Sequence, residues 1–85
     1  MKEDYIATFY SHYEAMCFKK KCDQQKIPAT LMPVPRDLSS SCGTCVLFQC
    51  EENLLSFISG EKDDIEMIVK CEKSGYTYKY QAENS

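Results

Sequence analysis

Two cysteines three positions apart, Cys42 and Cys45, are the residues of this sequence whose type and spacing could do chemistry. A Cys-x-x-Cys pair can close a small disulfide, supply two ligands to one metal ion, or present one reactive thiol beside another. Sulfur chemistry uses the thiolate, which forms at neutral pH where neighbouring groups stabilise its charge. We interpret Cys42 as the reactive thiol. Cys45 lies at the start of an apolar segment, so a catalytic role and a packing role are equally supported for its side chain.

The neighbours of Cys42 are of kinds that can stabilise a thiolate. Arg36 supplies a fixed positive charge in the same polar segment. Ser41 and Gly43 belong to a tight turn whose backbone N–H groups can point at an anionic sulfur. Because Gly43 has no side chain, the backbone of another protein can also approach the sulfur closely. We therefore expect Arg36 to assist the reaction, and Ser41 and Gly43 to bind the atom that Cys42 holds.

Other candidate sites have weaker support from spacing. A zinc site needs four ligands, and Cys50 and Cys71 would complete one only if the fold gathered them beside the Cys-x-x-Cys pair. The single histidine, His12, could act as a base for Cys42 if two loops met. In the fold expected below, we expect those loops at opposite ends of their strands. The sequence therefore predicts no metal and no cofactor.

Composition narrows the class of protein. The chain has 85 residues and a net charge of −3, which predicts one domain over residues 1–85 and disfavours nucleic-acid binding, since such proteins usually present a basic surface. No apolar stretch approaches the roughly 20 residues of a membrane span. The N-terminus lacks the apolar region of an export signal. We expect a cytoplasmic protein with reduced thiols, even with six cysteines.

The hydrophobic pattern predicts the elements that must position the cysteine loop. Ser11 followed by Glu14 is typical of a helix start, and the stripe of Ala15, Phe18 and Cys22 indicates the buried face of that helix. Residues 51–60 stay ambiguous between helix and strand. The predicted elements are a strand at 5–10, a helix at 12–25, strands at 29–34 and 44–50, a second helix between Asp63 and Gly75, and a last strand at 76–80. Asp63 with Glu66 is a second helix-start signal, Ile65, Ile68 and Val69 form a helical stripe, and Gly75 is expected to follow the end of that helix.

This order predicts an α+β protein, a two-layer sandwich of the βαββαβ ferredoxin-like kind. It would have a four-stranded sheet with two helices on one face. Pro33 lacks a backbone N–H, so the second strand should lie at an edge or end there. The cysteine loop would join the second and third strands.

The loop also resembles the signature of a known family, the small bacterial selenium/sulfur carrier-like proteins. The run that carries the resemblance is Val34-Pro35-Arg36-Asp37-Leu38-Ser39-Ser40-Ser41-Cys42-Gly43. The likeness covers residues 5–50 well and the remainder only by the order of elements. It implies that Cys42 is the carrier thiol, with Arg36 and Gly43 as further motif residues.

The first hypothesis is therefore that the protein is a carrier rather than a complete enzyme. Cys42 would accept sulfur or selenium as a persulfide or perselenide from a donor protein, such as a cysteine desulfurase or selenocysteine lyase, and pass it to an acceptor protein. One alternative is a thiol–disulfide redox protein that uses Cys42 and Cys45, and another is a non-catalytic interaction module. We expect no nucleic acid or membrane partner, and strand edges could pair in a homodimer.

Overall fold

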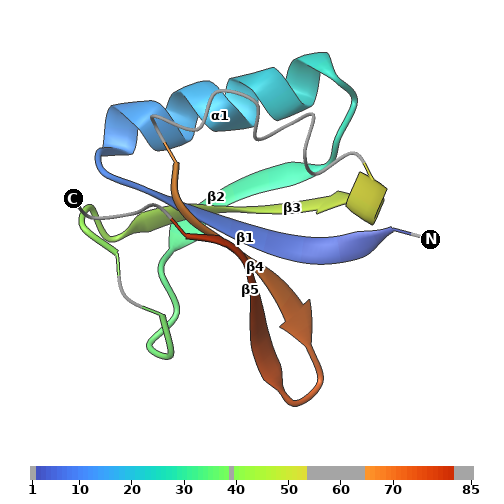
Figure 1. Cartoon of the computed structure of the whole chain (residues 1–85). Coiled ribbons are helices and arrows are strands. Elements are labelled where there is room, and N and C mark those ends of the chain that lie inside the picture. The colour runs from blue at the N-terminus through green and yellow to red at the C-terminus, as the bar shows by residue number, and fades with distance from the viewer. Residues whose placement is uncertain (1, 39, 54–64, 82–85) are drawn as a thin grey trace.

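A five-stranded antiparallel sheet organises the residues that the computed structural model describes, which are 2–38, 40–53 and 65–81. The strand order is β2-β3-β1-β4-β5, and α1 covers one face of the sheet (Figure 1). The elements in chain order are β1 (Glu3–Phe9), α1 (His12–Gln24), β2 (Ala29–Pro33), β3 (Thr44–Cys50), β4 (Ile65–Glu72) and β5 (Gly75–Gln81). The expected α+β class is confirmed.

The first half of the chain follows the predicted elements. Ser11 is the N-cap of α1: its hydroxyl oxygen accepts a hydrogen bond from the backbone N–H of Glu14 at 3.2 Å. The Ser11 hydroxyl in turn donates to the Glu14 carboxylate at 3.0 Å. After the last turn Lys26 takes a positive φ of 60°, and Pro28 follows, so the helix cannot continue.

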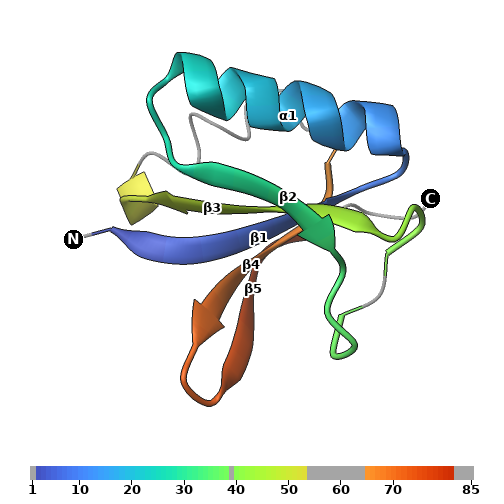
Figure 2. The ribbon, with the colours of Figure 1, turned by 180° about the vertical axis from the view of Figure 1, so that it is seen from behind.

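Pro33 is the last residue of β2, and β2 is an edge strand, as predicted. Figure 2 shows β2 at this edge, below α1, with the following segment turning away from the helix. β1 and β2 both pair with β3 in the antiparallel sense. The two strands therefore run in the same direction, with β3 between them, so both end at the same side of the sheet.

Aromatic packing fixes α1 on the sheet. Phe18 lies 5.2 Å from Phe9 and 5.3 Å from Phe48, measured between ring centroids, and Phe48 stacks on Tyr5 at 5.6 Å. All four side chains are buried. Ala15, Phe18 and Cys22 are the buried residues of α1, which confirms the predicted stripe.

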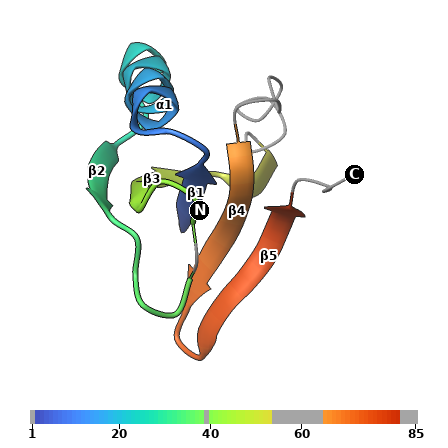
Figure 3. The ribbon, with the colours of Figure 1, turned by 90° about the vertical axis from the view of Figure 1, so that its left-hand side faces the viewer.

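A second, smaller cluster lies on the face of the sheet away from α1. Its buried members are Ile6, Leu38, Cys45, Met67 and Val69. Leu38 comes from the segment between β2 and β3, which lies on this side together with the β4–β5 hairpin (Figure 3). The sheet is thus buried on both faces near its centre.

The predicted second helix is wrong. Residues 65–72 form β4, which pairs with β1 on one side and β5 on the other. Ile65 and Ile68 pack on the helix side of the sheet, whereas Met67 and Val69 pack on the opposite side. A strand buried on both faces has an almost continuous apolar run, and in a short segment such a run matches the helical period as well.

The end of the chain confirms the predicted last strand, which pairs with β4 as a hairpin. Gly75, expected to follow a helix, instead begins β5 after the turn with φ of 141°. Within the ambiguous segment, Glu52 and Asn53 are helical, and residues 54–60 lie outside the described residues, as does Asp63. In the described ranges, five strands and the helix α1 that packs on them stand in place of the expected four strands and two helices.

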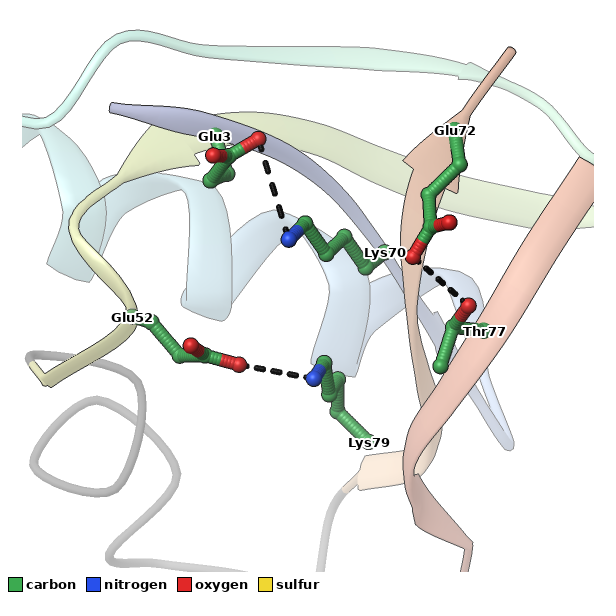
Figure 4. Close-up of polar contacts among 6 residues, drawn as sticks. All are labelled: Glu3, Glu52, Lys70, Glu72, Thr77 and Lys79. Carbon is green, nitrogen blue, oxygen red and sulfur yellow. Dashed lines mark hydrogen bonds and ion pairs between the residues drawn. The ribbon is translucent and has the colours of Figure 1, made fainter. Parts of the chain in front are cut away.

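Polar contacts join β4 and β5 to each other and to neighbouring segments of the chain (Figure 4). Lys79 of β5 lies 2.7 Å from the carboxylate of Glu52, and Lys70 of β4 lies 3.9 Å from that of Glu3. The hydrogen bond from Lys79 lowers the pKa of Glu52. Exposed pairs of this kind contribute little to the stability of the fold. No helix in the described ranges has the length and apolar character to cross a bilayer.

Candidate functional site: the Cys42 loop

The cysteine loop lies where β1 ends and where α1 and β4 begin. The Ser40 hydroxyl donates a hydrogen bond to the carbonyl oxygen of Phe9, the last residue of β1, at 3.3 Å. His12, the first residue of α1, places Nδ1 3.2 Å from the hydroxyl of Thr44. The expectation that the loops after β1 and β2 lie at opposite ends was therefore wrong. Both strands run in the same direction, so their following loops meet.

Local hydrogen bonds shape the loop between β2 and β3. A turn at its start is closed by the N–H of Leu38, which donates to the carbonyl of Pro35 at 3.0 Å. At its end, the N–H of Val34 donates to the carbonyl of Gly43 at 3.1 Å. Gly43 has φ of 74°, a left-handed conformation that glycine adopts without strain. These constraints place Cys42 two residues before Thr44, the first residue of β3.

The Cys42 thiol is half-buried and packs beside the core on the helix side of the sheet. Its sulfur donates a hydrogen bond to the carbonyl oxygen of Thr44 at 3.3 Å, and it lies 4.0 Å from the hydroxyl of Ser40. A carbonyl oxygen only accepts hydrogen bonds, so the thiol is the donor in this contact. When the proton leaves, the Ser40 hydroxyl is the neighbouring group that can turn and donate to the sulfur.

Cys45 lies in a different environment. It is fully buried in the cluster on the opposite face of the sheet, and its thiol donates to the carbonyl of Pro33 at 3.7 Å. Burial raises the pKa of Cys45 to about 11. The sheet therefore separates the surroundings of Cys42 and Cys45, and joining them in a disulfide would require the start of β3 to rearrange.

The other predicted site residues, Ser41, Gly43 and Arg36, differ in the contacts that they make. Ser41 is beside Cys42, but its N–H and hydroxyl donate to Glu66 and not to the sulfur. Gly43 shapes the turn. Arg36 is exposed, and within the described residues no hydrogen bond or ion pair holds its guanidinium.

The sequence did not predict the role of Glu66, a residue near the start of β4 whose carboxylate contacts the cysteine loop. Glu66 accepts hydrogen bonds from Ser41 and from the buried hydroxyl of Thr8. Its position in the sequence carried the signal, because it is an acidic residue between Ile65 and Met67 in an apolar run. It was instead assigned to the start of the helix that does not form.

The remaining cysteines are dispersed. Cys22 and Cys50 are buried on the helix side of the sheet, and Cys71 packs beside the cluster on the opposite side. Among the described residues, no group of three or more His, Cys, Asp or Glu side chains is placed to hold a metal ion. Nothing in this arrangement gathers the four cysteines that a zinc site would use.

The thiols should differ sharply in reactivity. At pH 8 iodoacetamide should modify exposed Cys17 and half-buried Cys42, and it should modify Cys22 and Cys45 at least about tenfold more slowly. Burial raises the pKa of Cys22 to about 12, so neither of the protected thiols forms much thiolate at this pH. Peptide mapping by mass spectrometry over time measures the four rates. Labelling of Cys45 as fast as Cys17 in the folded protein would contradict this description of the site.

Comparison with known proteins places the chain in a family. A family model described as "Putative Se/S carrier protein-like" matches residues 4–70, which extend from β1 into β4 and include the whole Cys42 loop. No curated protein and no solved structure matches the chain significantly. Since the matched residues make up most of the sequence, the chain belongs to the Se/S carrier protein-like family.

Proposed function

We propose that the protein carries sulfur or selenium on Cys42, as a persulfide or perselenide, between a donor protein and an acceptor protein. The observation that carries the proposal is the position of Cys42: its half-buried thiol lies 4.0 Å from the Ser40 hydroxyl, donates to the Thr44 carbonyl and is held in a loop at the end of the sheet. An accessible thiol on a small protein suits a carrier, because both donor and acceptor must reach the same sulfur. Family membership supports the same chemistry.

The transfer consists of two thiol exchanges. In the first, the Cys42 thiolate attacks the outer sulfur of a donor persulfide, R–S–SH, forming Cys42–S–SH and releasing the donor thiolate, R–S⁻. In the second, an acceptor thiolate attacks the outer sulfur and Cys42 leaves as a thiolate. Neither step needs an external oxidant or reductant. Selenium takes the place of the outer sulfur in the same two exchanges.

Three loop residues assist Cys42 in this proposal. The Ser40 hydroxyl, 4.0 Å from the sulfur, donates to the thiolate after the proton has left. Gly43 leaves room for the partner backbone, since nothing lies within 4 Å of the place where a side chain would begin. Arg36 is exposed and adds positive charge to the same loop. Cys45, buried with a raised pKa, has a packing role.

The proposed partners are proteins: a cysteine desulfurase or a selenocysteine lyase as the donor, and an unidentified thiol protein as the acceptor. Tyr10 and Tyr13, next to the point where His12 contacts the loop, are 42% and 74% exposed. Exposed aromatic side chains are enriched in protein interfaces. We place the carrier in the cytoplasm, where thiols such as its six free cysteines stay reduced.

Loading of Cys42 tests the proposal. The protein is incubated with a cysteine desulfurase and cysteine, or with a selenocysteine lyase and selenocysteine, and its intact mass is measured without reductant. We expect the mass of one added sulfur or selenium atom, which dithiothreitol removes. A matched Cys42→Ala protein should stay unmodified. If the wild-type protein gains no sulfur or selenium, or if the Cys42→Ala protein gains as much, the carrier function is refuted.

A further inference from the structure

We propose that Glu66 is the positioning residue of the Cys42 loop, an inference that rests on the proposed carrier function. Glu66 does not touch the sulfur. It acts through Ser41, the residue immediately before Cys42, and fixes the direction from which the thiol meets a partner protein. Neither the loop motif nor the spacing of the cysteines indicates this role.

The Glu66 carboxylate accepts three hydrogen bonds, and both of its oxygens take part. Oε1 accepts from the backbone N–H of Ser41 at 3.3 Å and from the hydroxyl of Thr8 at 3.2 Å. Oε2 accepts from the hydroxyl of Ser41 at 2.7 Å. One carboxylate therefore holds the main chain and the side chain of the same loop residue.

This contact connects an exposed loop to the centre of the sheet. Ser41 is exposed, whereas Thr8 is fully buried on the central strand β1. Glu66 lies near the start of β4, at the register shift in the pairing of β4 with β1. Two hydrogen bonds to one residue fix its orientation as well as its position. With a single hydrogen bond, the residue could still rotate about that bond.

Further contacts hold the loop on either side of Ser41. Ser40 is attached to the end of β1 through the carbonyl of Phe9, and Thr44 contacts His12 at the start of α1. Glu66 supplies an attachment from β4. It makes two hydrogen bonds to Ser41, the residue next to Cys42 in the sequence. Sulfur transfer between two proteins depends on the alignment of the attacking sulfur, and small misplacements are costly.

Two substitutions separate positioning from charge. In a Glu66→Gln protein, the amide oxygen can still accept from Ser41 and Thr8, and the amide N–H can donate to the Ser41 hydroxyl. The negative charge is lost but the attachment is kept. In a Glu66→Ala protein both are lost. Glu72→Ala is the matched control, since Glu72 lies on the same strand and accepts a 2.7 Å hydrogen bond from Thr77, at the other end of β4 (Figure 4).

The first measurement is amide hydrogen exchange at Ser41, which needs no partner protein. Ser41 N–H should be protected in the wild-type, Glu66→Gln and Glu72→Ala proteins, and it should exchange at least about tenfold faster in Glu66→Ala, because its acceptor is missing. Equal exchange in the wild-type and Glu66→Ala proteins would overturn the proposed attachment. Urea denaturation of each variant shows whether the whole fold, and not the loop alone, has been weakened.

The second measurement is the rate of sulfur uptake from a cysteine desulfurase supplied with cysteine. We expect uptake by Glu66→Ala to fall by about 10- to 100-fold, uptake by Glu66→Gln to stay near the wild-type rate, and iodoacetamide to alkylate Cys42 in both variants about as fast as in the wild type. A small reagent needs no fixed direction of approach. Normal uptake by Glu66→Ala refutes the positioning role alone, whereas absence of uptake by the wild-type protein refutes the carrier function and this inference with it.

Discussion

Replacing Cys42 with serine should reduce sulfur transfer from donor to acceptor to the level measured without the protein. The serine hydroxyl can keep the hydrogen bond to the carbonyl of Thr44, so the loop should keep its shape while the nucleophile is lost. Replacing Cys45 with alanine should leave transfer within about twofold of the wild-type rate, because a buried thiol with a raised pKa is a poor nucleophile. Stopped-flow or quenched assays with isotopically labelled cysteine measure both rates.

The same pair of variants distinguishes the carrier from a thiol–disulfide redox protein. A redox cycle that used both thiols would stop when either was removed. The Cys45→Ala protein should lose about 1 kcal/mol of unfolding free energy through the small cavity it creates, so its assay is run well below its unfolding temperature. Equal loss of activity in the Cys42→Ser and Cys45→Ala proteins would contradict the carrier account and favour the redox alternative.

Replacing Phe48 with alanine should have the largest effect on stability. Its side chain is 1% exposed and lies between the rings of Tyr5 and Phe18, so it joins β1, β3 and α1. Deleting a buried phenylalanine side chain costs about 3–5 kcal/mol. Small domains have a total stability of about 5–15 kcal/mol, so the variant should be close to unfolding. Urea denaturation followed by circular dichroism measures the change.

Tyr78→Ala is the control for that substitution. Tyr78 is also an aromatic strand residue, but it is 59% exposed on the edge strand β5. Its removal should change the unfolding free energy by less than about 0.5 kcal/mol, as is usual at surface positions. If Phe48→Ala were no more destabilising than Tyr78→Ala, α1 would not be held on the sheet by the aromatic cluster.

The first half of the fold was predictable because its signals are local. Ser11 and Glu14 mark the start of α1, and the spacing of Ala15, Phe18 and Cys22 identifies its buried face. Prediction failed where a long-range contact decides the structure. Residues 65–72 have the apolar spacing of a helix, and only their pairing between β1 and β5 makes them a strand.

The composition of the loop predicts Cys42 as the reactive residue, and this stays a prediction. The surroundings of Cys42 could not be predicted from the sequence. Its neighbours come from separate strands and a helix, so the contact of Ser41 with Glu66 bridges residues 25 positions apart. The relation between Cys42 and Cys45 was also hidden. Their spacing suggests a pair, but residues alternate between the two faces of a sheet once a strand begins, and Cys45 is already inside β3.

Delivery of the loaded atom tests the central claim most directly. The protein is loaded with isotopically labelled sulfur, separated from the donor, and mixed with a thiol protein that accepts persulfide sulfur. We predict that the label leaves Cys42 and appears on the acceptor thiol, and that intact mass spectrometry finds Cys42 returned to its free form. If the label stays on the protein, or is found on another cysteine such as Cys17, Cys42 does not carry the atom between partners and the account fails.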